Sequence, residues 1–183
     1  MSLPEDVRLR TAVEADIDAI TRISNHYVLN TAANLRLRLF EPEEWRANLE
    51  KQGEDFPWLV AERDGRVLGF AYAALWNERE AYAWSVESTV YLDEAARGAG
   101  IGRALYSELF DRLAAQGFVT VIAKITRPND ASEGLHRSLG FALTGVLEKI
   151  GFKNGQWHDV GVWQKDLAER SVPPPLLRPS EDD

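Results

Sequence analysis

A short alternating stretch, Trp84–Leu92, contains the residues of this chain best suited to chemistry. In an extended strand, alternate side chains point to opposite faces, so Glu87, Thr89 and Tyr91 share one face while the other face is suited to a core. A carboxylate on an enclosed strand can take a proton from an attacking group, which makes Glu87 a candidate general base. The alternative is a glutamate that is simply paired with a lysine.

Glycines follow this stretch where a helix is expected to begin. Arg97 is followed by Gly98, Gly100 and Gly102, and apolar residues then recur at four-residue spacing from Ile101. Backbone amides at a helix N-terminus, approached closely through glycine, bind phosphate or pyrophosphate. No Gly-Lys-Ser/Thr follows, which excludes a P-loop, and the even glycine spacing differs from a dinucleotide-binding motif. A tight turn without a ligand is the alternative.

Two more candidates lie later in the chain. Asn129 precedes a helical pattern and is expected to cap its start. His136 lies within that helix, and an imidazole can donate or accept a proton near neutral pH. The alternative for His136 is a histidine on the helix surface beside Arg137.

Periodicity and turn signals predict the elements that position these residues. The predicted strands span 7–11, 58–62, 67–75, 82–92, 118–125, 141–150 and 157–165, and the predicted helices 14–29, 42–53, 101–117 and 129–139. Residues 30–38 are a loop or a short helix. The order β-α-α-β-β-β-α-β-α-β-β predicts one mixed α/β domain over residues 1–170. The proline-rich, acidic residues 171–183 are expected to be a disordered tail.

Composition narrows the possible functions. The 183 residues carry a net charge of −8, which argues against a nucleic-acid surface. The chain has no cysteine, which excludes disulfides and thiolate metal sites, and its three histidines lack metal-ligand spacing. No apolar run suits a membrane span and the first residues do not resemble a signal peptide, so we expect a cytoplasmic protein without a membrane segment.

The run W-S-V-E-S-T-V-Y-L, followed by R-x-x-G-x-G at 97–102, resembles the GNAT superfamily of N-acetyltransferases. Within that superfamily the chain is similar to the phosphinothricin (bialaphos-resistance) acetyltransferases. The similarity extends from N-H-Y at Asn25 through P-W-L-V-A-E at Pro57 and A-Q-G-F at Ala115 to W-H-D-V-G at Trp157. It implies a mixed central sheet flanked by helices, in which strands 82–92 and 118–125 splay apart and hold acetyl-CoA.

The resemblance also implies roles for individual residues. Glu87 is the base that deprotonates an amine, and His136 assists proton movement. The residues implied to bind acetyl-CoA are Val90, Tyr91, Leu92, Arg97, Gly98, Gly100, Ile101, Gly102, Arg103, Asn129 and Ser132. The residues implied to bind the acceptor are Leu35, Arg79, Thr89 and Tyr91. No metal is implied, and a homodimer is expected.

The acceptor region departs from the family pattern. The family has Phe-Arg-Thr where this chain has Leu35-Arg36-Leu37, and lysine where this chain has Asn77. The loss of a ring and a cation could shift preference from phosphinothricin toward methionine sulfone or sulfoximine. Alternative functions are acetylation of peptide or protein N-termini, or a non-catalytic sensor of acyl-CoA.

Overall fold

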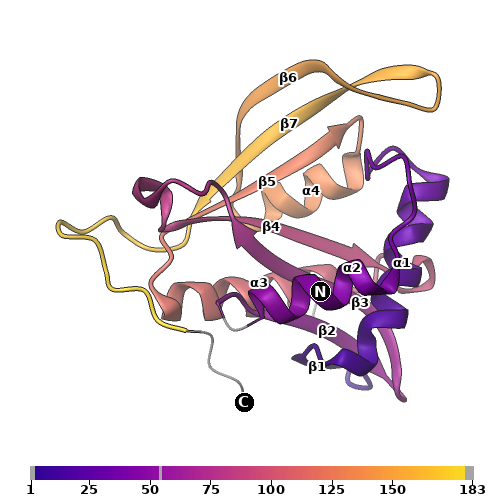
Figure 1. Cartoon of the computed structure of the whole chain (residues 1–183), viewed down its shortest axis with the longest axis horizontal. Coiled ribbons are helices and arrows are strands. Elements are labelled where there is room, and N and C mark those ends of the chain that lie inside the picture. The colour runs from indigo at the N-terminus through magenta and orange to yellow at the C-terminus, as the bar shows by residue number, and fades with distance from the viewer. Residues whose placement is uncertain (1–2, 54, 180–183) are drawn as a thin grey trace.

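A mixed sheet of seven strands, in the order β1-β2-β3-β4-β5-β7-β6, runs through the described residues, 3–53 and 55–179, of this computed structural model (Figure 1). Only β4 and β5 pair in parallel within that described sheet. The strands are β1 Arg8–Thr11, β2 Trp58–Arg63, β3 Arg66–Leu75, β4 Ser85–Leu92, β5 Thr120–Arg127, β6 Ala142–Lys153 and β7 Gln156–Asp166. The helices are α1 Ile17–Asn30, α2 Pro42–Gln52, α3 Ile101–Gln116 and α4 Asp130–Ser138. The predicted fold class and element order are confirmed.

Several predicted boundaries were wrong. Strand β5 spans Thr120–Arg127 instead of 118–125, and β6 continues to Lys153 instead of ending at 150. Two other elements are preceded by a 3-10 turn. The strand predicted from residue 82 begins at Ser85, because Glu80–Tyr82 form a turn of 3-10 helix closed by bonds from Tyr82 N and Ala83 N. The helix predicted from residue 14 begins with a 3-10 turn, Glu14–Asp16, before α1. In both places local backbone hydrogen bonds close a turn that apolar periodicity does not reveal.

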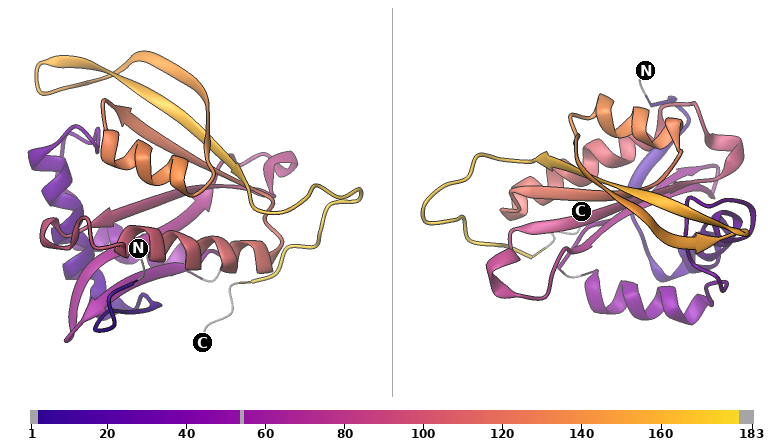
Figure 2. Two further views of the ribbon diagram at one scale, coloured as in Figure 1. Left: turned by 180° about the vertical axis from the view of Figure 1, so that it is seen from behind. Right: turned by 90° about the horizontal axis from the view of Figure 1, so that it is seen from above.

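The helices cover both faces of the sheet. Helix α3 packs on β2, β3 and β4, while α1 lies against β3 and β4 and contacts α2 (Figure 2). Each side has its own buried core. The α3 side includes Leu105, Leu109, Val121 and Trp163, and the α1–α2 side includes Ile20, Trp45, Trp58 and Phe70. Burial on both sides fixes the central strands, and these strands carry the site described below.

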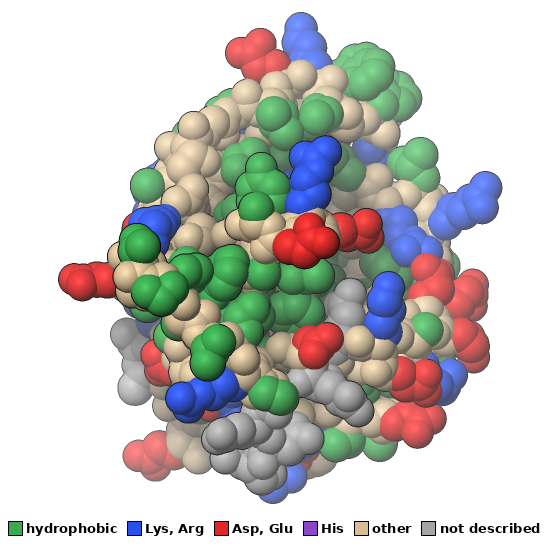
Figure 3. Space-filling view, turned by 60° about the vertical axis from the view of Figure 1, so that its left-hand side comes forward, with side chains coloured by type: hydrophobic (Ala, Val, Ile, Leu, Met, Phe, Trp, Pro, Cys, Tyr) green, Lys and Arg blue, Asp and Glu red, His purple; other side chains and the backbone are tan. Residues whose placement is uncertain are grey.

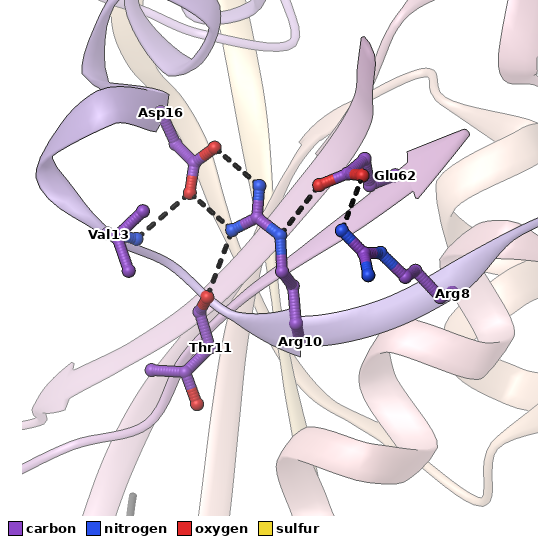
Figure 4. A network of polar contacts seen from close by, with 6 residues as sticks. All are labelled: Arg8, Arg10, Thr11, Val13, Asp16 and Glu62. Atoms are coloured by element: carbon purple, nitrogen blue, oxygen red, sulfur yellow. Dashed lines mark hydrogen bonds and ion pairs between the residues drawn. The ribbon is translucent and has the colours of Figure 1, made fainter. Parts of the chain in front are cut away.

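An ion-pair cluster joins the start of the chain to β2. Arg10 donates to both carboxylate oxygens of Asp16 at 2.7 and 2.8 Å and to Glu62 at 2.7 Å, and Arg8 donates to Glu62 at 2.8 Å (Figure 4). Asp16 and Glu62 are both buried. Burial disfavours the charged form of Asp16, but hydrogen bonds from Arg10 and Val13 N outweigh it and lower its pKa. Arg10 thus binds two buried carboxylates at once, and Arg8 supplies the second positive charge.

Strands β4 and β5 pair over only part of their length. Register runs from Ser85 opposite Thr120 to Glu87 opposite Ile122 and then stops. Strand β4 continues to Leu92 along β3, and β5 continues to Arg127 along β7. The two strands therefore diverge after Glu87, as the resemblance implied.

The hairpin of β6 and β7 extends away from the rest of the sheet (Figures 1 and 2). Residues 142–150 of β6 are exposed, although several are large and apolar. The exposed apolar residues of the hairpin are Leu143, Val146, Leu147, Ile150, Phe152 and Trp157. Apolar surface concentrated on one strand is typical of an interaction surface.

The proline-rich segment 171–179 contains no helix or strand, yet it contacts the domain; residues 180–183 lie outside the described part. Trp84 Nε1 donates to Pro175 O at 2.7 Å, and Arg178 N donates to Gln116 O at 2.9 Å. Figure 3, from the side where this segment leaves the sheet, shows hydrophobic side chains gathered near the centre of that face. No helix in residues 3–53 and 55–179 is long and apolar enough to cross a bilayer.

Candidate active site

A cavity of about 1040 Å³ opens where β4 and β5 separate. Its walls come from β4, the loop before α3, the first turns of α3, β5, α4, the loop after α1, and β7. Most of the predicted site residues meet here: Glu87, Thr89, Val90, Tyr91, Leu92, Arg97, Gly98, Gly100, Ile101, Gly102, Arg103, Asn129, Ser132 and His136. Strand β4, which carries the candidate base Glu87, and the start of α3, which is suited to bind phosphate, therefore line the same cavity.

Two of the predicted acceptor residues lie outside the walls of this cavity. Leu35 packs against β6, where a Cβ added at Gly151 would come within 2.5 Å of Leu35 Cδ1. Arg79 is exposed at the start of the 3-10 turn before β4. Their roles toward the acceptor stay predictions.

Glu87 is half-buried and paired with a lysine. Its Oε2 lies 2.9 Å from Lys124 Nζ, and the two side chains are 27% and 44% exposed. Both line the cavity. The sequence left two interpretations of Glu87, a proton acceptor or the partner of a lysine. Both apply, because Glu87 pairs with Lys124 and both side chains line the cavity.

Beyond its pairing with β5, the edge of β4 presents backbone N–H and C=O groups to the cavity. Trp84 O accepts from Val119 N and Thr120 N of the neighbouring segment, and alternation turns the backbone of Val90 to the same edge. Leu92 also lines the cavity, but its N and O both contact the Tyr27 hydroxyl, at 3.3 and 2.9 Å. Val90 is thus the position beyond the paired region where an extended ligand can add to the strand.

The loop before α3 contains residues with positive φ, a backbone conformation that glycine adopts without strain. Gly98 and Gly100 have φ of +78° and +80°, and Gly100 is the N-cap of α3. Arg97 lies over the Tyr27 ring at 5.1 Å, and Arg103 donates to Ser138 O at 3.3 Å. Amides at the start of a 16-residue helix, with two arginines beside them, suit a pyrophosphate.

Replacing Gly98 with alanine should weaken acetyl-CoA binding about tenfold. The added Cβ meets no protein atom within 4 Å, so the effect comes from holding a non-glycine residue at positive φ, which costs about 1–2 kcal/mol. Calorimetric titration with acetyl-CoA measures it. Gly65→Ala is the matched control, because Gly65 has φ of +76°, the same open surroundings and a place outside the cavity wall. Equal dissociation constants for both variants would contradict the assignment.

His136 is 2% exposed and packed between the rings of Tyr106 and Phe141. Its Nδ1 lies 2.8 Å from Ser132 O, and because a carbonyl oxygen only accepts, Nδ1 carries the proton. Its Nε2 is buried without a hydrogen-bond partner. Burial lowers the pKa of His136, against the opposing hydrogen bond to Ser132 O. His136 is therefore a neutral imidazole whose free nitrogen can accept a proton.

His136 should take up a proton at lower pH in the folded protein than in the unfolded chain, because burial lowers its pKa. Its folded pKa is lowered, so the unfolded chain binds the extra proton first, and the stabilisation from the neutral buried form is lost as pH falls below about 6.5. Nitrogen-15 NMR of the imidazole over a pH series should show the Nδ1–H tautomer at neutral pH and a titration midpoint below the ordinary value of about 6.5. A midpoint at or above that value would contradict the prediction.

Asn129 confirms the predicted cap. Its Oδ1 accepts from Ser132 N at 3.2 Å at the start of α4. Both residues also line the cavity, so capping leaves the Asn129 amide nitrogen available to a ligand.

Sequence reasoning missed Tyr106 and Lys124. Tyr106 lies on the buried face of α3 and lines the cavity, and burial raises the pKa of both its phenol and that of Tyr91. Both phenols thus stay protonated and can donate. The sequence offered one signal for Tyr106. A tyrosine on an apolar helix face is expected to lie beside a polar group or an opening, because a buried phenol needs a hydrogen-bond partner.

The loop after α1 is held against the cavity by a buried lysine. Lys153 Nζ donates to Val28 O and Asn34 O, each at 2.6 Å, and burial lowers its pKa. Asn34 Nδ2 in turn donates to the Tyr91 hydroxyl at 3.0 Å. The β6–β7 hairpin thereby orients a phenol in the cavity. Among the described residues, no cluster of three or more His, Asp or Glu side chains could hold a metal ion.

Residues 9–162 match the family described as "Acetyltransferase (GNAT) domain". The chain is 45% identical to phosphinothricin N-acetyltransferase of Streptomyces viridochromogenes over 94% of each chain. It is 38% identical to the L-methionine sulfoximine/L-methionine sulfone acetyltransferase of Salmonella typhimurium, over 90% of this chain and 97% of that one. The solved phosphinothricin acetyltransferase of Sinorhizobium meliloti in complex with acetyl-CoA superposes with a TM-score of 0.87 at 39% identity, covering 96% of this chain and 94% of that one. This chain therefore belongs to the GNAT acetyltransferase family.

Proposed function

We propose that this protein acetylates the α-amino group of phosphinothricin, methionine sulfone or methionine sulfoximine, with acetyl-CoA as the acetyl donor. The observation that carries the proposal is the shared cavity: Glu87 stands where β4 and β5 diverge, and the glycine loop before α3 faces the same space. The relatives at 45% and 38% identity act on these small amino acids.

The residues present fit acetyl-CoA. The loop Arg97–Gly102, with Arg103 at its end, would hold the pyrophosphate, and the free edge of β4 at Val90 would pair with the pantetheine arm. Asn129 and Ser132 line the same wall at the start of α4. The arm would end beside Glu87, the last residue of β4 that pairs with β5.

The chemistry follows from the groups in the wall. Glu87 takes a proton from the acceptor's ammonium, and the freed amine attacks the thioester carbonyl. A carbon–nitrogen bond forms while the carbon–sulfur bond breaks, and the sulfur leaves as a thiolate. Val90 N–H can stabilise the oxyanion formed on the way. The nitrogen loses its second proton as the amide forms, and this proton balances the one that the departing thiolate takes up. The protonated phenols of Tyr91 and Tyr106 can donate hydrogen bonds to the thiolate. The chain has no cysteine to carry the acetyl group, so transfer is direct.

Thiol release from acetyl-CoA, followed with a thiol-reactive dye, tests the proposal. Phosphinothricin, methionine sulfone, methionine sulfoximine and a short peptide are compared as acceptors, and the protein itself adds no thiol background. Turnover of one or more of the three amino acids supports the proposal. Turnover of the peptide alone would make N-terminal acetylation the function, and acetyl-CoA binding without turnover would favour a sensor.

We also propose a homodimer built on the β6–β7 hairpin. Leu143, Val146, Leu147 and Ile150 are each 37–56% exposed on β6, and such an apolar strand is well suited to a partner surface. Light scattering coupled to size exclusion should give twice the mass of one chain. A single-chain mass at micromolar concentration would reject the dimer.

A further inference from the structure

The pair of Glu87 and Lys124 spans the two central strands where they separate. Glu87 is the last β4 residue in register with β5, opposite Ile122, and Lys124 follows two positions later on the same face of β5. Their charged ends meet at 2.9 Å and both side chains reach the cavity. Opposite charges thus stand side by side in the wall where the acceptor must bind.

Lys124 is not needed there for the sheet. Its side chain is 44% exposed, it interrupts the apolar run of residues 121–125, and Glu87 is its carboxylate partner among residues 3–53 and 55–179. Its Nζ also lies 5.5 Å from the centre of the Trp76 ring, which holds the ammonium above an aromatic wall at the end of β3. A pair of partly exposed charges contributes little to stability, and both members of this pair are accessible to a ligand in the cavity.

The pairing creates a requirement for the acceptor. Glu87 must receive the acceptor's ammonium, yet it already faces one cation, and a second cation alone would be repelled by Lys124. An α-amino acid carries its carboxylate one carbon away from its ammonium. When the ammonium contacts Glu87, that carboxylate can contact Lys124, so that each charge meets its opposite.

We propose, on the basis of the function proposed above, that Lys124 binds the α-carboxylate of the acceptor and so determines specificity for amino acids with a free carboxyl group. The acceptor separates the Glu87–Lys124 pair and replaces it with two new ion pairs. Amines, amides and esters that lack the carboxylate leave Lys124 without an anion and leave their own ammonium beside it. They are therefore poor acceptors.

The test compares methionine sulfone with its methyl ester on the wild-type protein and on Lys124→Met. The ester changes the amine's own reactivity, but this difference cancels when the ratio of kcat/KM values is compared between proteins. We expect Lys124→Met to reduce the acid-to-ester ratio about 10- to 100-fold, mainly through KM of the acid, as for loss of a charged hydrogen bond. Turnover of the ester should not fall, because the variant removes the cation that repels the ester's ammonium.

Three further variants complete the design. Lys124→Arg should restore the preference for the acid, because a guanidinium also binds a carboxylate. Lys165→Met removes a lysine of β7 outside the cavity wall and should leave the ratio unchanged. Arg79→Met tests the arginine that the sequence predicted to bind the acceptor.

The outcomes separate this inference from the function on which it rests. An unchanged ratio in Lys124→Met, or loss of the ratio in Arg79→Met instead, would overturn the inference while wild-type turnover stands. An equal fall of kcat for acid and ester would also overturn it, and would make Lys124 a positioning residue for Glu87. Absence of wild-type turnover with both acceptors would reject the function itself.

Discussion

Glu87→Gln should lower kcat by about two to four orders of magnitude, the usual contribution of a general base. Glutamine has nearly the same size and can still accept a hydrogen bond from Lys124, but it cannot take the proton from the acceptor's ammonium. The affinity for acetyl-CoA should stay within about threefold, because the phosphate loop is built from other residues. Thiol release and calorimetric titration measure the two effects separately.

A pH series distinguishes a lost base from a distorted site. Without the base, only acceptor molecules that are already neutral react, so the rate of Glu87→Gln should rise about tenfold per pH unit below the amine's pKa. Glu108→Gln on the surface of α3 is the control and should keep the wild-type rate. A fall of less than tenfold in Glu87→Gln, with an unchanged pH profile, would remove Glu87 from the role of base.

Arg10→Met should destabilise the fold by about 3–5 kcal/mol at pH 7, the usual effect of leaving a buried charge without its partner. Asp16, 4% exposed, loses both bonds from the guanidinium, whereas Glu62 keeps Arg8. Urea unfolding measures the difference. Arg63→Met is the control: Arg63 pairs with an exposed carboxylate, Asp6, and should change stability by less than about 1 kcal/mol.

The loss of stability caused by Arg10→Met should become smaller as the pH falls. The pKa of Asp16 is lowered in the folded protein, so the stabilisation it provides is present above its unfolded value near 3.8 and is lost as pH falls through the folded value. Acidification below about pH 4 should therefore narrow the gap between Arg10→Met and the wild type. A gap of constant size from pH 7 to pH 3 would show that packing, and not charge, is what Arg10 contributes.

Local patterns predicted most of the fold and the cofactor side of the site. The alternation of Glu87, Thr89 and Tyr91 and the glycines at 98, 100 and 102 are read within a few residues, and the structure places them in one cavity. The turn between β2 and β3 is also encoded locally, because Asp-Gly favours the positive φ that Asp64 and Gly65 both have.

What the sequence did not reveal depends on contacts between distant segments. Glu87 meets Lys124 because β4 and β5 align at a particular register, and no local pattern encodes that register. The burial of Lys153 is similar, since its acceptors are carbonyls more than 100 residues away in sequence. One signal was available: a lysine interrupting the apolar run 118–125 is costly to bury and therefore suggests an opening beside it.

Helix α3 separates the cavity from the proline-rich segment 171–179. Its first residue lies in the cavity wall, and its last, Gln116, binds the proline-rich segment through Arg178. A 16-residue helix is about 24 Å long, so the chain's C-terminal segment is attached far from the cofactor loop. A reporter attached to a side chain within residues 171–179 would therefore lie far from the glycines before α3 and would report on the domain without contacting the cavity wall.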